Sequence, residues 1–108
     1  ATAESEPEQR RFRARDTARQ IRNERARSLA GLIRKVGERP ELDFSTTIQL
    51  VNRKLAEHSG EYVDQLSIAQ LCEQQELLKQ WASALSRAAR EGRAARWLRE
   101  WEGATGGN

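Results

Sequence analysis

Residues 68–92 carry the strongest periodic pattern in the chain, and they read IAQLCEQQELLKQWASALSRAAREG. Apolar and small residues recur there at alternating steps of three and four, which places them on one face of a helix. These positions are Ile68, Leu71, Gln75, Leu78, Ala82, Leu85, Ala89 and Gly92, with Leu71, Leu78 and Leu85 at the d sites of a heptad. The pattern predicts a long helix from near Tyr62 to Arg90. Its seam packs either on other helices of the same chain or on a second copy.

Upstream of this stretch, the sequence predicts a second, shorter amphipathic helix. Phe44, Ile48, Val51 and Leu55 recur at steps of four, three and four, which forms one apolar stripe. Asp43 or Ser45 is placed to accept the free amide hydrogens of the first turn. Gly60 suits the left-handed position that follows a helix. We therefore expect a helix over residues 45–58, with His58 exposed near its end.

The N-terminal third of the chain is strongly basic. From Arg10 to Arg39 there are eleven basic and three acidic residues, a difference of eight positive charges in a chain whose net charge is +3. Few helix breakers precede Gly37 and Pro40, so this segment predicts one long helix that ends there. Residues 1–9 carry acidic side chains and no basic one. We expect a flexible acidic tail at residues 1–9 and a second flexible tail at residues 103–108.

Arginines are concentrated at the start of this basic helix, with eight in residues 10–27. Arg11, Arg15, Arg22 and Arg25 lie within about 80° of one another on a helical wheel, and Arg19 lies beside them. Further along, the same side carries Leu29, Leu32, Ile33 and Val36. Because arginine is seldom buried, we expect residues 10–27 to project from the bundle as an arginine-rich arm. Guanidinium groups bind phosphate oxygens, so this side of the arm is the predicted contact with nucleic acid, either DNA or RNA.

A short element at residues 93–102 holds Trp97 and Trp101, one helical turn apart. On a continuous helix both would lie away from the leucine seam, which predicts a break at Gly92 and a separate short helix. The two tryptophans then take one of two roles. They cap the hydrophobic core, or they form a partner-binding surface together with Leu71, Leu78 and Leu85.

The residue types present do not support an enzymatic function. The chain has one histidine and one cysteine, Cys72, and it contains neither a glycine-rich phosphate loop nor paired His or Cys ligands. We therefore expect a protein that is not an enzyme, with no catalytic residue, metal site, cofactor or small-molecule substrate. Cys72 is expected in the core, because free cysteine is usually buried. Neither a signal peptide nor a membrane-spanning stretch occurs, so we expect a cytoplasmic or nuclear protein without a membrane partner.

These observations predict an all-α fold, a small helical bundle of three main helices and a short C-terminal helix. It forms a single domain over residues 10–102 with the arginine-rich arm at residues 10–27. The expected core consists of Leu29, Leu32, Ile33, Val36, Ile48, Val51, Leu55, Leu71, Leu78, Trp81 and Leu85. The predicted function is non-enzymatic nucleic-acid binding through the arginine-rich helix, as a homodimer or within a complex. The alternative is a helical adaptor or assembly subunit that binds an acidic or hydrophobic protein partner.

The two functions require different surfaces. Nucleic-acid binding needs arginines that are exposed and unpaired, because phosphate must reach them. An adaptor needs exposed apolar side chains, which Tyr62, Trp97 or Trp101 would supply.

Overall fold

The structure is a computed structural model, and it describes residues 6–59 and 63–103, with side chains described from residue 13 onward. Within these ranges every regular element is helical: α1 (Glu6–Val36), α2 (Phe44–Ser59), the 3-10 turn η1 (Val63–Gln65), α3 (Ile68–Arg90) and α4 (Ala94–Gly103). The prediction of an all-α fold with three main helices and a short C-terminal one is confirmed. α1 begins at Glu6, earlier than the predicted start at Arg10. Residues 1–5 and 104–108, which belong to the two predicted tails, lie outside the described residues.

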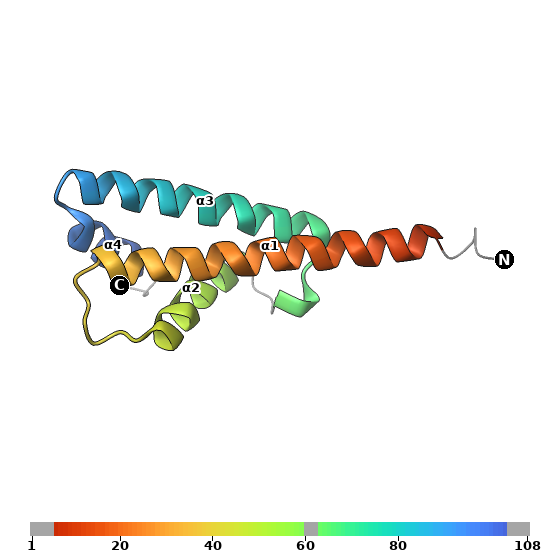
Figure 1. The fold of residues 1–108 in the computed structure, drawn as a ribbon, viewed down its shortest axis with the longest axis horizontal. Helices are drawn as coiled ribbons and strands as arrows, with labels where there is room; N and C mark the ends of the chain where they lie inside the picture. Colours follow the sequence, from red (N-terminus) through yellow and green to blue (C-terminus); the bar gives the residue numbers. More distant parts are fainter. Residues whose placement is uncertain (1–5, 60–62, 104–108) are drawn as a thin grey trace.

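α1 is the central element and runs along most of the molecule (Figure 1). α3 lies beside it and runs in the same direction, while α2 packs obliquely against α1 (Figure 1). α4 folds back from the end of α3 and reaches the C-terminal end of α1. The first turns of α1 extend beyond η1 and α3, and the molecule is correspondingly elongated, measuring 60 × 28 × 21 Å.

The C-terminal end of α1 is fixed by the close approach of α4. The Gly37 N–H donates to the Ile33 carbonyl oxygen at 2.8 Å. A Cβ atom at position 37 would lie 2.5 Å from that oxygen and 2.7 Å from Leu98 Cδ2. Because no side chain fits here without a shift of its neighbours, glycine is required at this position. The predicted end of the helix at Gly37 is confirmed.

A side-chain cap defines the start of α2. Asp43 Oδ1 accepts a hydrogen bond from the Thr46 backbone N–H at 2.7 Å, so Asp43 and not Ser45 is the capping residue. This hydrogen bond lowers the pKa of the Asp43 carboxyl, because it stabilises the charged form. Gly60, the residue expected to follow the helix, lies outside the described residues.

The limits of α3 are also set by local geometry. Ser67 and Gln70 form a capping box, in which each side chain accepts a hydrogen bond from the other residue's backbone N–H. This cap explains why α3 begins at Ile68, later than the predicted start near Tyr62. At the other end, Gly92 adopts a φ of 73°, and the following N–H donates to the Ala88 carbonyl oxygen at 2.8 Å. The predicted break at Gly92 is therefore confirmed.

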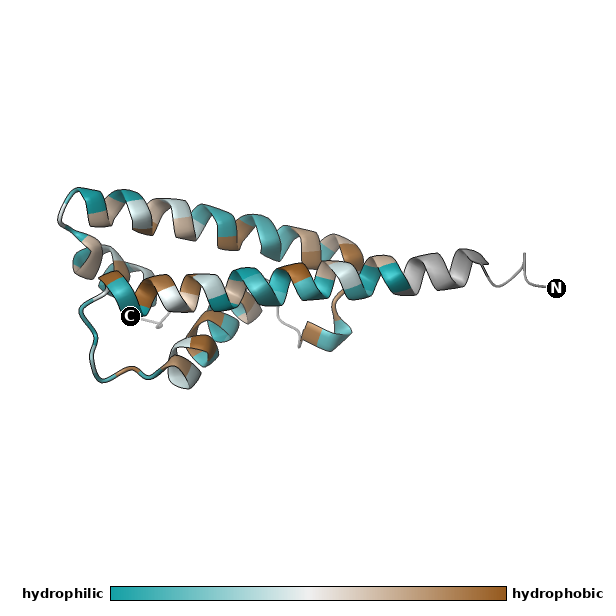
Figure 2. Ribbon diagram, viewed as in Figure 1, coloured by the Kyte–Doolittle hydropathy of each residue, from teal (hydrophilic) through white to brown (hydrophobic). Residues whose placement is uncertain are grey.

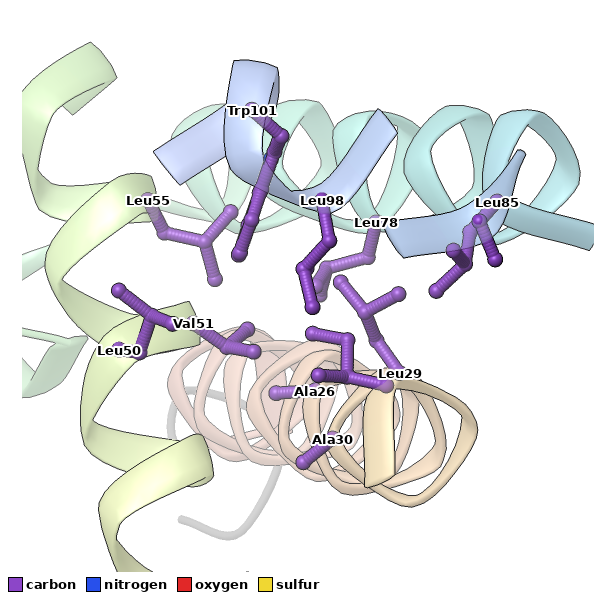
Figure 3. Close-up of a cluster of buried hydrophobic side chains, with 12 residues drawn as sticks. Ala26, Leu29, Ala30, Leu50, Val51, Leu55, Leu78, Leu85, Leu98 and Trp101 are labelled. Atoms are coloured by element: carbon purple, nitrogen blue, oxygen red, sulfur yellow. The ribbon is translucent and has the colours of Figure 1, made fainter. Parts of the chain in front are cut away.

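Side chains from all four α-helices meet in one hydrophobic core (Figure 3). Of the predicted core, seven residues are fully buried: Leu29, Ile33, Val51, Leu55, Leu71, Leu78 and Leu85. Four others are partly buried: Leu32, Val36, Ile48 and Trp81. Leu98 of α4 is fully buried but was not predicted. Leu71 lies in a second, smaller cluster with Ala18 and Leu66, which joins the N-terminal half of α1 to the start of α3.

Hydropathy changes along α1 from hydrophilic to apolar (Figure 2). Its apolar residues are concentrated in the C-terminal half, where they face the core. Cys72 was expected in the core but is exposed. The inner face of α3 at this level is occupied by its neighbours Leu71 and Gln74, which are both buried. Among the helices that the structure describes, none is long and apolar enough to cross a membrane.

Candidate nucleic-acid interface

The central arginine of the predicted phosphate-binding stripe, Arg22, lies inside the fold with 5% of its surface exposed. Its Nε–H donates to Gln74 Oε1 at 2.9 Å, and its Nη1–H donates to Asn23 Oδ1 at 3.0 Å. Gln74 is also buried and donates in turn to Ser59 Oγ at 2.9 Å. This chain of polar groups connects α1, α3 and α2. The expectation that Arg22 projects into solvent is therefore wrong.

Two further arginines of the stripe are held by backbone carbonyl groups. Arg25 donates to the Gln75 carbonyl oxygen at 3.2 Å, and Arg15 donates to the carbonyl oxygen of Asp64 in η1. The side chain of Gln75 returns a hydrogen bond to the Ala18 carbonyl oxygen of α1 at 2.9 Å. Both arginines are half-buried. From Arg15 onward, the predicted arm is thus docked on α3 and η1.

The remaining two residues of the predicted set differ from these three. Arg19 is exposed and forms an ion pair with Asp16 at 3.5 Å, one turn away on α1. The side chain of Arg11 lies outside the described residues. The predicted stripe is therefore a mixture of buried, half-buried and surface arginines, and it does not present a continuous basic surface.

The opposite side of α1 carries a different row of arginines, which the sequence analysis did not single out. Arg13, Arg27 and Arg34 are all exposed, and none of them forms a salt bridge with a described residue, although the charge of Arg34 adds to the Thr46 hydrogen bond in lowering the pKa of the Asp43 carboxyl. They are separated by multiples of seven residues, so they lie within about 60° of one another on the helix, spaced about 21 Å and about 10 Å along its axis. We call these three residues the outer arginine row. Gln20, also exposed, occupies the heptad position between Arg13 and Arg27.

The partner-binding residues predicted from the leucine seam are internal. Leu71, Leu78 and Leu85 are no more than 1% exposed, so the seam packs within the chain. A homodimer through this seam would require the monomer to open. Of the two alternatives for the seam, the structure shows the intramolecular one.

The tryptophans form an aromatic cluster between α3 and α4. Trp101 is 8% exposed, and its ring lies 5.9 Å from that of Trp97 in a stacked arrangement and 5.4 Å from that of Trp81 at an edge. Lys54 Nζ lies 5.3 Å from the centre of the Trp101 ring, a cation–π distance. Trp97 is half-buried. As a pair, these side chains close the core and do not form an exposed aromatic surface.

Groups suited to metal binding or acid–base chemistry do not gather in the part of the chain that the structure describes. No cluster of three or more His, Cys, Asp or Glu side chains occurs among these residues. His58 is exposed, and its ring packs against Trp81 with a centroid distance of 5.8 Å.

Comparison with known proteins gives no match: no family model, no curated protein and no solved structure is similar to this chain. Any assignment of function therefore rests on the geometry of the chain itself.

Proposed function

We propose that the protein is a non-enzymatic nucleic-acid-binding protein that contacts phosphates through the outer arginine row, Arg13, Arg27 and Arg34. The observation that carries the proposal is the row itself, three exposed arginines on one side of a straight helix without ion-pair partners among the described residues. The burial of Trp101 and of the leucine seam supports binding by charge over binding by an aromatic patch.

The mechanism is electrostatic and needs little sequence readout. A guanidinium group forms charge-assisted, often bidentate hydrogen bonds with phosphate oxygens. Each phosphate that is neutralised releases condensed counterions, so affinity falls as the salt concentration rises. The inner arginines contribute rigidity, since Arg15, Arg22 and Arg25 anchor α1 on η1 and α3. A fixed helix presents the outer row in one geometry, which reduces the entropy lost on binding.

The salt dependence of binding to a mixed-sequence oligonucleotide tests this proposal. Three phosphate contacts predict a slope of about −2 to −3 in a plot of log affinity against log salt concentration. The triple variant R13Q/R27Q/R34Q is expected to lose most of the affinity and most of the slope. Gln20→Arg adds a fourth arginine to the row, and it is expected to steepen the slope by about 0.7 to 0.9.

A second triple variant, R87Q/R90Q/R99Q, controls for net charge. These three arginines are exposed on α3 and α4 and have no ion-pair partner among the described residues. The control removes the same three charges from another surface, so it is expected to retain most of the affinity. Equal losses in both triple variants, or a parent protein that does not bind, would exclude the outer row as the interface.

A further inference from the structure

An open groove of about 510 Å³ lies between α1 and α2, next to η1. Its apolar walls are formed by Ala26 of α1, Phe44 and Ile48 of α2, and Val63 of η1. Its polar lining includes Arg22, Asn52 and Arg27, and Arg27 is also a member of the outer arginine row. Phe44 is 40% exposed, which is unusual for a large apolar side chain. The volume is within the range of about 300 to 1,000 Å³ that is typical of ligand sites.

The buried cation of this groove, Arg22, has no anionic partner among the described residues. A guanidinium carries five N–H donors, and for Arg22 two of them have acceptors, the neutral side chains of Gln74 and Asn23. Three donors are left over, and no carboxylate of a described residue pairs with the group. A buried charge without a counter-ion is costly in free energy. A carboxylate in the groove would supply the missing charge and the missing acceptors together.

A second polar atom of the groove also lacks a partner. Asn52 Oδ1 is buried and accepts no hydrogen bond from the described residues. Buried polar atoms are hydrogen-bonded in the large majority of cases, so an unsatisfied acceptor in a groove lined by a guanidinium with spare donors indicates an incomplete site. The groove thus needs a ligand with an anionic acceptor, an N–H donor and apolar surface. A peptide that carries an acidic side chain has all three.

We propose that this groove binds a protein partner through a segment in which a carboxylate stands next to an apolar side chain. The carboxylate pairs with Arg22, a backbone or side-chain N–H donates to Asn52 Oδ1, and the apolar side chain packs on Phe44 and Ile48. The site goes beyond the proposed nucleic-acid contact, with which it shares Arg27. Its apolar walls favour a peptide over the phosphates of a nucleic acid, whose sugar-phosphate backbone offers little apolar surface.

The test is an NMR titration of the full chain with two capped peptides, acetyl-Leu-Glu-Leu-amide and its glutamine counterpart acetyl-Leu-Gln-Leu-amide. Because both ends of the peptide are capped, the glutamate side chain carries its one charge. The glutamate peptide is expected to shift the Arg22 Nε–H and the Asn52 side-chain amide signals, and to bind at least about tenfold more tightly than the glutamine peptide. Equal affinity for the two peptides, or shifts confined to Arg13 and Arg34, overturns the proposal.

Variants that leave Arg22 and Arg27 unchanged test the apolar wall without unfolding the chain. Phe44→Ser removes an exposed ring from the groove and is expected to weaken binding of the glutamate peptide several-fold. Ile68→Ser is the matched control, because Ile68 is 39% exposed and does not line the groove. Equal effects of the two substitutions overturn the proposal.

A competition experiment separates this site from the proposed nucleic-acid contact. A mixed-sequence oligonucleotide is added to the complex of protein and glutamate peptide. Retention of the peptide signals at Arg22 is the expected result. Displacement of the peptide from Arg22 would identify the groove as a phosphate site and overturn the assignment to a peptide. Loss of oligonucleotide binding in R13Q/R34Q bears on the two arginines of the outer row that do not line the groove, so it leaves the peptide comparison intact.

Discussion

The packing of α4 makes a quantitative prediction for Leu98→Ala. The Leu98 side chain is 0% exposed, and its Cδ2 lies against the end of α1 at Gly37. Truncation of a fully buried leucine costs about 2–5 kcal/mol, through lost apolar burial and the cavity that it leaves. A domain of this size is stable by about 5–15 kcal/mol in total. The variant is therefore expected to lose a large fraction of its free energy of unfolding.

Urea unfolding followed by two signals measures this loss. Tryptophan fluorescence reports on α4, because Trp97 and Trp101 lie on it and Trp81 contacts Trp101 at a ring distance of 5.4 Å. Circular dichroism reports on the long helices. Both midpoints are expected to fall by about 1 M or more, given slopes of about 1–3 kcal/mol per molar of urea. Ile68→Ala, at a site 39% exposed, serves as the control and is expected to change little. A loss below about 1 kcal/mol for Leu98→Ala would refute the packing of α4.

Three other substitutions test local features by the same unfolding assay. Gly37→Ala places a Cβ 2.7 Å from Leu98 Cδ2 and is expected to cost about 1–3 kcal/mol, whereas Gly31→Ala, with nothing within 4 Å, is expected to stabilise α1. Gln74→Leu removes an acceptor from the buried Arg22 and is expected to cost about 1–3 kcal/mol, against little change for Gln80→Leu on the exposed side of α3. The pKa of Asp43 is lowered by the Thr46 amide, so its stabilising contribution is complete above the unfolded-state pKa of about 3.9 and is lost as the pH falls through the lower folded-state value. Asp43→Asn keeps a capping side chain that does not titrate, and its urea midpoint is expected to fall less than that of the parent between pH 6 and pH 2.5. Equal falls in the two proteins would mean that the ionisation of Asp43 does not contribute to stability.

The helices were predictable because their signals are local. Each signal relates residues that lie one or two helical turns apart. These signals are the heptad of residues 68–92, the spacing of apolar residues before Leu55, and the glycines at positions 37 and 92. Leu98 was missed because α4 is only ten residues long and its single leucine, between Trp97 and Arg99, carries no period. Its burial depends on the reversal at Gly92, which brings α4 back onto α1.

The candidate site was less predictable, because the burial of arginine depends on distant residues. On a helical wheel Arg22 lies on the same side as the core leucines, and the structure agrees with that placement. What the sequence could not show was the acceptor, Gln74 Oε1, which lies 52 positions away. Gln75 at an a position was the available signal, since a polar residue in an apolar seam implies a polar partner on the facing helix. Arginines that dock inward leave those on the other side of α1 exposed.

Modification of arginines by phenylglyoxal, followed by mass spectrometry, tests most directly whether the outer row and not the predicted stripe faces the ligand. Without nucleic acid, we expect fast modification of Arg13, Arg27 and Arg34 and slow modification of Arg22, which is 5% exposed. With a saturating mixed-sequence oligonucleotide, the outer row is expected to be protected while Arg87 and Arg90 on α3 still react. Rapid modification of Arg22 in the folded protein, or protection of α3 without protection of the outer row, would contradict the account.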